Sequence, residues 1–192
     1  MLVQDTIYDA FLEKFIAAVA SFRLGDGMDE NNTLGPLVSS KAANDVHSMV
    51  QDAVADGARV ALGGGPAQNL GECFYQPTVL VDVRTDMRVF REEIFGPVAP
   101  VFRFRDEAEA IAMANDTEFG LASYVYTRDI GRVWRVSEGI DYGMVGVNEV
   151  GISSEVIPFG GMKESGLGRE GSKYGIDDYI ETKYICMGGL DA

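Results

Sequence analysis

The sequence predicts an α/β fold, with a mostly parallel sheet sandwiched by helices. Segments rich in β-branched residues alternate with segments whose apolar residues recur at helical spacing, which is typical of strands joined by helical crossovers. At 192 residues and 46% hydrophobic content, the chain is long enough to bury about 70% of its unfolded surface. We expect an α/β domain over residues 1–160, a glycine-rich connecting segment over 161–177 and a terminal strand over 178–190.

Helix signals and β-formers alternate along the first hundred residues. Ser39 is a favourable helix N-cap, and Gly57 is a favourable stop for the helix that follows it. Pro77 interrupts a run of β-formers and indicates an edge strand or a kink, since proline cannot donate to a strand ladder. The predicted helices cover residues 6–25 and 39–56, and the predicted strands cover 59–62, 74–83 and 98–104.

The second half continues the alternation. Asp106 with Glu109 three residues later forms a capping-box signal, and Asp129 caps a further helix. The predicted elements are a helix over 106–114, a strand over 123–126, a helix over 129–140 and a strand over 144–147. Residues 178–187 alternate like a strand, and a strand at the end of a chain needs a partner sheet.

Charge and hydropathy exclude several classes of function. The net charge is −14, from 30 acidic and 16 basic residues, and such a balance repels nucleic acid and anionic lipid. No segment approaches the ~20 apolar residues that span a bilayer, and residues 1–5 do not form a signal peptide. We expect a cytoplasmic protein with no nucleic-acid or membrane partner.

The two cysteines, Cys73 and Cys186, favour neither a metal site nor a nucleophile. With the single His47 they cannot form a metal cluster, and neither is flanked by basic residues or a helix N-terminus that would lower the pKa of a thiol. Both are predicted to be buried, inert thiols.

Residues Gly166, Gly168 and Gly171 match the spacing of a dinucleotide-binding fingerprint. That motif requires a buried strand before it, a helix opening from it and an acidic residue about 20 positions later. The preceding residues 162–165 are mostly polar, and no such strand–turn–helix unit is visible. A glycine-rich surface loop is the favoured interpretation, and an independent nucleotide-binding protein is the rival.

A carboxylate and an aromatic ring are predicted to lie together around Glu93. Alternation along an extended segment places Glu93 and Phe95 on the same side, and Pro97 restricts Gly96 to extended geometry. A carboxylate can accept hydrogen bonds from the vicinal hydroxyls of a ribose while the sugar packs on the ring. A solvated loop is the simpler interpretation of these residues alone.

Six motifs in order make the chain similar to the C-terminal half of the aldehyde dehydrogenase superfamily over nearly its whole length. The tail over residues 165–179 resembles that of succinate-semialdehyde dehydrogenases most, and glutarate-semialdehyde enzymes share much of it. The motifs are Gly35-Pro36-Leu37, Gln76-Pro77-Thr78, Glu92-Glu93-Ile94-Phe95-Gly96-Pro97, the segment 115–122, the segment 143–148 and Pro158-Phe159-Gly160-Gly161.

The resemblance implies a role for five residues. Glu93 would bind the nicotinamide ribose and Phe95 would pack against it. Asn148 would support the substrate tunnel near its bottom, Ser153 would bond the far carboxylate of the semialdehyde, and Phe159 would line the tunnel. A strand-end cap is the alternative for Asn148, and a core aromatic is the alternative for Phe159.

The resemblance also implies that this chain is a fragment. The reactive cysteine of the family, its general base and its dinucleotide-binding domain would all lie before Met1, so no catalytic or metal-binding residue is expected here. NAD or NADP would serve the full-length enzyme without binding tightly to this chain. The terminal strand would join an oligomerisation sheet, which implies a homo-oligomer. A noncatalytic assembly or binding module derived from the same fold is the alternative.

Overall fold

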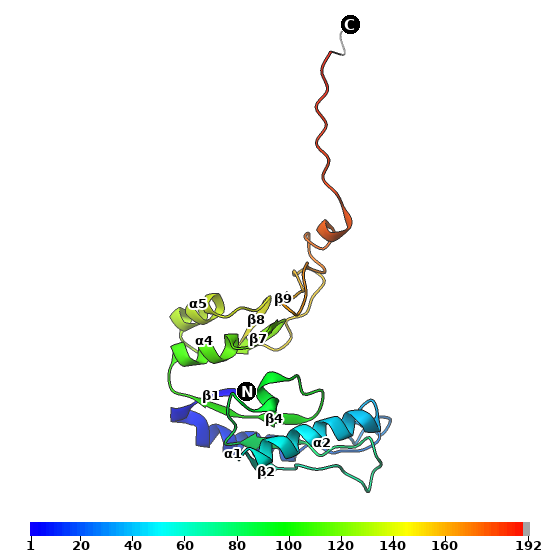
Figure 1. Cartoon of the computed structure of the whole chain (residues 1–192), viewed down its shortest axis with the longest axis vertical. Coiled ribbons are helices and arrows are strands. Elements are labelled where there is room, and N and C mark those ends of the chain that lie inside the picture. Colours follow the sequence, from blue (N-terminus) through cyan, green and yellow to red (C-terminus); the bar gives the residue numbers. More distant parts are fainter. Residues whose placement is uncertain (190–192) are drawn as a thin grey trace. The chain divides into compact units, whose positions relative to one another are not determined.

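The computed structural model describes residues 1–189 and divides the chain into two compact units (Figure 1). Unit 1 covers Met1–Met113 and unit 2 begins at Ala114. Strands and helices alternate in both, and three of the five strand pairs among the described residues are parallel, so the predicted α/β class is confirmed. The predicted boundary at residue 160 stays a prediction.

Unit 1 is built on two small sheets. In the first, β3 lies between β2, which is antiparallel to it, and β4, which is parallel; in the second, β1 and β5 are parallel. The strands are β1 (Leu2–Gln4), β2 (Arg59–Leu62), β3 (Thr78–Val81), β4 (Val98–Pro100) and β5 (Phe102–Phe104). The helices are η1 (Asp5–Ile7), α1 (Tyr8–Ala20), α2 (Ser40–Ala55), α3 (Arg88–Arg91) and α4 (Glu107–Asn115), which runs into unit 2.

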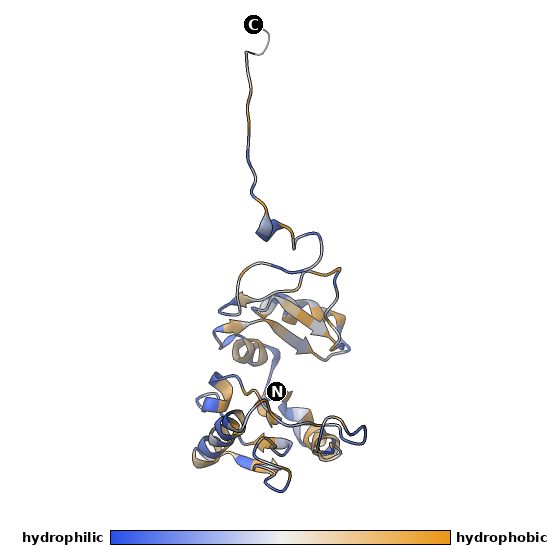
Figure 2. Ribbon diagram, turned by 90° about the vertical axis from the view of Figure 1, so that its right-hand side faces the viewer, coloured by the Kyte–Doolittle hydropathy of each residue, from blue (hydrophilic) through white to orange (hydrophobic). Residues whose placement is uncertain are grey.

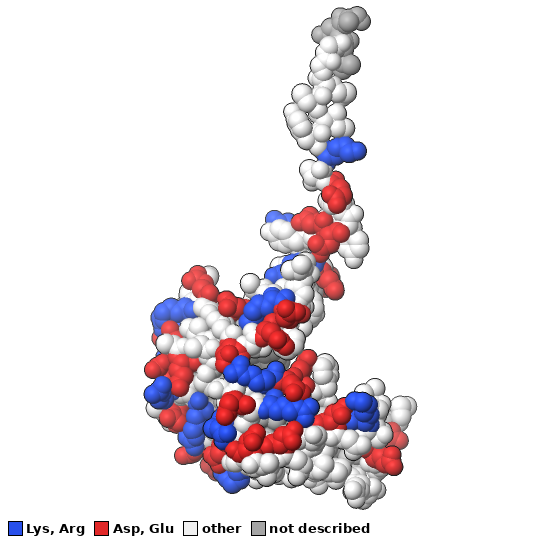
Figure 3. All heavy atoms as spheres, viewed as in Figure 1, with Lys and Arg blue, Asp and Glu red and all other residues white. Residues whose placement is uncertain are grey.

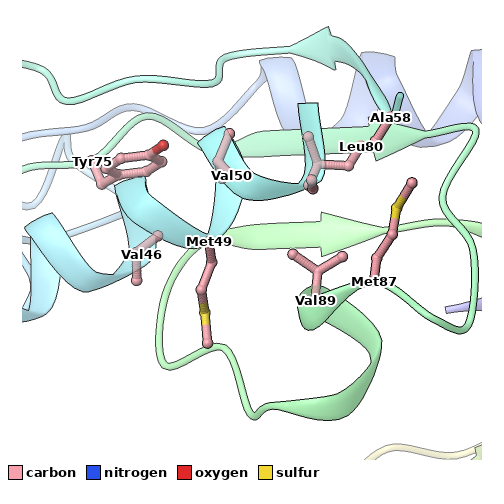
Figure 4. Close-up of a cluster of buried hydrophobic side chains, with 9 residues drawn as sticks. Val46, Met49, Val50, Ala58, Tyr75, Leu80, Met87 and Val89 are labelled. Atoms are coloured by element: carbon pink, nitrogen blue, oxygen red, sulfur yellow. The ribbon is translucent and has the colours of Figure 1, made fainter. Parts of the chain in front are cut away.

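Strand β3 separates two hydrophobic clusters because its side chains alternate between its faces. Leu80 belongs to a cluster with Val46, Met49 and Val50 of α2 (Figure 4). Val79 and Val81 belong instead to a cluster to which α1 contributes, and all three β3 side chains are at most 1% exposed. Helices therefore cover both faces of this strand, as the sequence predicts.

Two predictions about unit 1 are wrong. Pro77 lies just before β3 and not within it, so β3 is a central strand, and the N–H of Thr78 donates to the Pro97 carbonyl at 2.8 Å. The strand predicted over 98–104 divides at Val101, since β4 pairs with β3 and β5 pairs with β1. The choice of partner strand is a tertiary effect that a run of β-formers does not encode.

Unit 2 holds two further strand pairs. β7 (Ala122–Val125) and β8 (Met144–Val147) are parallel and are joined through α5 (Ile130–Gly139), whose N-cap Asp129 accepts from the Arg132 N–H at 3.1 Å. β6 (Phe119–Gly120) and β9 (Met162–Lys163) pair antiparallel. Neither of these two-residue strands was expected, nor was β1.

The C-terminal part of the described chain contains turns, a 3-10 helix (η2, Asp177–Tyr179) and then an extended segment (Figures 1 and 2). Within residues 1–189, no strand partner is assigned to residues 180–189, and Tyr184 is 86% exposed. The predicted oligomerisation strand over 178–190 thus stays a prediction, and its last residue lies outside the described residues. Cys186 is exposed and Cys73 is only partly buried, so the expectation that both cysteines are buried is wrong.

The structure also shows how charged and apolar side chains are distributed. On the face drawn in Figure 3, acidic and basic side chains are interspersed. Among residues 1–189, no helix is both long and apolar enough to cross a membrane, and no group of three His, Cys, Asp or Glu side chains is placed to hold a metal ion.

Candidate functional site

Glu93 and Phe95 lie in the loop between α3 and β4. Both are exposed, Phe95 to 76%, whereas Ile94 between them is partly buried and packs against the α2 cluster. This is the alternation that the sequence predicts for an extended segment. The loop therefore presents a carboxylate and an aromatic ring to the outside of unit 1 while its middle residue is anchored in the core.

Gly96 fixes the end of this loop. A Cβ atom at this position would lie 2.7 Å from Val46 Cγ2, closer than packed atoms tolerate, so only glycine allows the loop to approach α2 this closely. The Gly96 N–H donates to the Ile94 carbonyl at 2.9 Å, and the Val98 N–H donates to the Gly96 carbonyl at 2.8 Å. Backbone bonds and close packing thus hold the chain just after Phe95.

The two adjacent carboxylates of the loop have different surroundings. Glu92 accepts from Arg88 Nε at 2.9 Å, while no described side chain within residues 1–189 bonds to the Glu93 carboxylate. Both oxygens of Glu93 are therefore free to accept hydrogen bonds from a ligand. Beside the exposed Phe95 ring, they fit a ribose, whose hydroxyls donate and whose carbon face is apolar.

Asn148 follows β8 and clamps the end of β7. Its Oδ1 accepts from the Thr127 N–H at 2.9 Å and its Nδ2 donates to the Thr127 carbonyl at 2.7 Å, while its own backbone φ is +54°. The structure thus shows the strand-end cap that was the alternative interpretation. This cap is compatible with the predicted role of Asn148 in supporting the substrate tunnel, because the cap fixes where the loop after β8 begins.

Ser153 lies exposed in the loop that follows Asn148. The start of this loop is held by Glu149, whose Oε1 accepts from the N–H groups of Val150 and Gly151 at 2.8 Å each. These backbone bonds, that of Gly151 first, lower the pKa of Glu149. The end of the loop is held by the Ser172 N–H, which donates to the Glu155 carbonyl at 2.9 Å. The Ser153 hydroxyl is thus carried on a loop tethered at both ends.

Phe159 is half-buried and joins the glycine-rich segment. It exchanges two backbone hydrogen bonds with Glu170, of 3.0 and 2.7 Å. It is therefore neither a fully buried core aromatic nor a free surface ring. Within unit 2 the predicted substrate residues Asn148, Ser153 and Phe159 follow one another along a single loop, and within unit 1 the predicted cofactor residues share another.

The glycine fingerprint has none of the surroundings that a dinucleotide requires. The strand before it is the two-residue β9, and turns rather than a helix follow it. Arg169 Nη1 inside the motif donates to the Gly161 and Gly168 carbonyls at 2.8 and 2.6 Å. The motif is a glycine-rich loop closed by its own hydrogen bonds, as the sequence predicts.

Sequence reasoning missed two supporting residues, Arg88 and Glu149. Arg88 has a signal in the sequence, since Glu92 lies four residues later on the same helical turn. Glu149 carries no such signal, because its partners are backbone groups of an irregular loop. An open depression in unit 1, lined by Asp26, Gly27, Met28, Pro36, Leu70 and Phe74, includes none of the predicted site residues.

The strands and loops described above define an α/β protein in which two loops, one in each unit, carry the predicted site residues. The sequence matches the model of the aldehyde dehydrogenase family over residues 1–185. The chain therefore belongs to the aldehyde dehydrogenase family, which confirms the resemblance.

Among relatives, the chain is 58% identical over 190 residues to a glutarate-semialdehyde dehydrogenase of Pseudomonas aeruginosa, covering 99% of this chain and 39% of that protein. It is 56% identical over 188 residues to the NADP⁺ succinate-semialdehyde dehydrogenase of Escherichia coli, covering 98% and 39%. A crystal structure of succinate-semialdehyde dehydrogenase from Burkholderia pseudomallei matches with a TM-score of 0.93 at 55% identity, over 97% of this chain and 38% of that one. The chain thus spans about two fifths of the length of these relatives.

Proposed function

We propose that this chain forms the substrate and ribose walls of an NAD(P)-dependent semialdehyde dehydrogenase of the cytoplasm, which oxidises succinate semialdehyde or a similar semialdehyde to the dicarboxylate. The observation that carries the proposal is the loop of Glu93 and Phe95, with its free carboxylate and exposed ring. The names of the relatives support the substrate class, because a glutarate- and a succinate-semialdehyde dehydrogenase are each more than half identical to this chain.

Each proposed residue has one task. Glu93 accepts hydrogen bonds from the ribose hydroxyls, and Phe95 packs against the sugar. The Ser153 hydroxyl donates a hydrogen bond to the far carboxylate of the substrate, so that the aldehyde end of the substrate is directed away from Ser153. Phe159 lines the tunnel, and Asn148 holds the start of the Ser153 loop. When bound, the nicotinamide ring accepts a hydride from the carbon that is oxidised.

The chain alone is proposed to be inactive and to bind NAD or NADP weakly. A nucleophilic cysteine, a general base and a dinucleotide-binding domain are proposed to come from polypeptide outside these 192 residues, since the chain spans only 39% of its relatives. Two ribose contacts cannot replace a domain that grips the whole dinucleotide. Calorimetry with each dinucleotide and the chain alone should show no binding tighter than about millimolar.

Complementation tests the proposal. The chain is mixed with the separately produced remainder of the Pseudomonas aeruginosa relative, and oxidation of succinate semialdehyde is followed. Glu93→Ala should raise KM for the dinucleotide. Ser153→Ala should raise KM for succinate semialdehyde but not for butanal, which has no far carboxylate, whereas the neighbouring Ser154→Ala serves as the control. An active mixture that is indifferent to both variants would contradict the site assignments.

The predicted terminal strand over 178–190 is proposed to pair with the sheet of a neighbouring copy. Its exposed side chains include Tyr179, Ile180, Tyr184 and Ile185, and unpaired backbone in an extended segment is a template for strand addition. A homo-oligomer follows from this proposal. Sedimentation that shows only monomer at high concentration would contradict it.

A further inference from the structure

Arg88 lies on α3, just before the loop that carries Glu93. It has no proposed contact with cofactor or substrate. Its Nη1 lies 3.0 Å from Asp52 Oδ2 and 3.3 Å from Ser48 Oγ, both on α2. Its Nε lies 2.9 Å from Glu92 Oε2. One guanidinium therefore connects a core helix to the residue that precedes Glu93.

Three residues of the loop, Glu92, Ile94 and Gly96, are held against α2 or against the hydrophobic cluster that α2 forms. We call these three residues the anchors of the loop. Arg88 joins Glu92 to α2, Ile94 packs into the α2 cluster, and Gly96 lies against Val46. Glu93 and Phe95 lie between these anchors and point to the outside. Each of the two ligand-facing side chains is therefore flanked on both sides by a residue that is fixed to the same helix.

We propose that Arg88 is a positioning residue, which holds the Glu93 carboxylate where it can receive the ribose hydroxyls of the cofactor. The inference rests on the proposed function. Its physical basis is that a rigid, planar guanidinium bonded to Asp52 and to Glu92 ties the start of the loop to α2. Lysine cannot reproduce this arrangement, because its ammonium is a point charge on a flexible stem.

Amide hydrogen exchange on the chain itself tests whether Arg88 holds the loop. The N–H groups of Glu92, Gly96 and Val98 all donate within or beside the loop. Arg88→Met should speed their exchange about five- to tenfold, whereas the Val101 N–H, bonded to Leu80 at 2.9 Å, should be unchanged. Arg88→Lys should give an intermediate increase.

Arg59→Met is the matched control. Arg59 lies on β2, in the same unit but outside the loop, and its Nε lies 3.2 Å from Asp82 Oδ2. The substitution therefore removes a comparable ion pair elsewhere in unit 1. Loop exchange should stay at the wild-type rate in this variant. Equal loop exchange in Arg88→Met and the wild type, or an equal increase in both arginine variants, would overturn the proposal.

Kinetics of the complemented enzyme test the role toward the ribose. Arg88→Met should raise KM for the dinucleotide about fivefold while kcat changes less than about twofold. An active mixture with unchanged KM would overturn this role alone. An inactive wild-type mixture would contradict the proposed function and the ribose role with it, and the exchange result would still decide whether Arg88 holds the loop.

Discussion

Asn148 bonds both the N–H and the carbonyl of Thr127 with the two ends of its side-chain amide, at 2.9 and 2.7 Å. It does so from a left-handed backbone conformation, with φ at +54°. The residue thus combines a clamp between the ends of β7 and β8 with a turn that starts the Ser153 loop. Its side chain and its backbone can be tested separately.

Asn148→Gly keeps the backbone conformation and removes the clamp, so we expect a loss of about 1–3 kcal/mol in the unfolding free energy of unit 2. Asn148→Ala should cost about 1 kcal/mol more, because a side chain without local hydrogen bonds disfavours positive φ. Fluorescence of Trp134, the single tryptophan and a member of unit 2, reports the transition. The exposed Ser153→Ala is the control, and equal stability of the glycine and alanine variants would refute the backbone argument.

Gly96→Ala should destabilise unit 1 by about 1–3 kcal/mol, since its Cβ would lie 2.7 Å from Val46 Cγ2 in a packed cluster. Gly35→Ala is a matched control, because Gly35 also precedes a proline and a Cβ there meets no atom within 4 Å. We expect the control to stay within about 0.5 kcal/mol of the wild type in urea unfolding. Two equally stable variants would show that Gly96 is not needed for the approach of the loop to α2.

Leu80→Ala should remove about 2–5 kcal/mol from the unfolding free energy of unit 1, because Leu80 is fully buried between β3 and α2. Val38, at 94% exposed, provides the contrast: Val38→Ala should change stability by less than about 0.5 kcal/mol. Similar losses in both variants would contradict the placement of the core on β3.

Tyr75 gives the fold a dependence on alkaline pH. Burial raises the pKa of this phenol to about 12 from 10.0, and its hydroxyl lies 3.2 Å from His47 Nδ1. The unfolded chain therefore loses the phenol proton at lower pH than the folded chain does. The stabilisation is fully present below about pH 10 and is lost as pH rises toward about 12.

Tyr75→Phe removes this group, so the stability of the wild type relative to the variant should decrease over that pH range. The unfolding free energies of both proteins, measured by denaturant titration at a series of pH values, provide the comparison. A constant difference across the range would contradict a buried, protonated Tyr75.

Much of the fold follows from local signals in the sequence. The predicted strand over Arg59–Leu62 has the observed bounds, and α2 begins after its N-cap Ser39, whose side chain accepts from the Ala42 N–H. Pairing was not predictable in the same way: the division at Val101 and the short strands β6 and β9 depend on partners far along the chain. Local caps act over one turn, whereas strand partners are chosen by tertiary packing.

The candidate site shows the same difference. The exposure of Glu93 and Phe95 around the anchored Ile94 follows from the two-residue period of extended chain. The supports Arg88 and Glu149 act through a neighbouring helix and through loop amides, which sequence spacing only partly reveals. Arg88 and Glu149 hold the loops in position through these contacts, and such contacts do not produce a sequence motif.

The most direct test of the central claim is the rate of dinucleotide reduction with succinate semialdehyde by the chain alone and by the chain mixed with the remainder of its Pseudomonas aeruginosa relative. We predict no reduction by the chain alone and measurable reduction by the mixture. Dinucleotide reduction by the chain alone would contradict the claim. So would a mixture that assembles into a stable complex and does not reduce the dinucleotide.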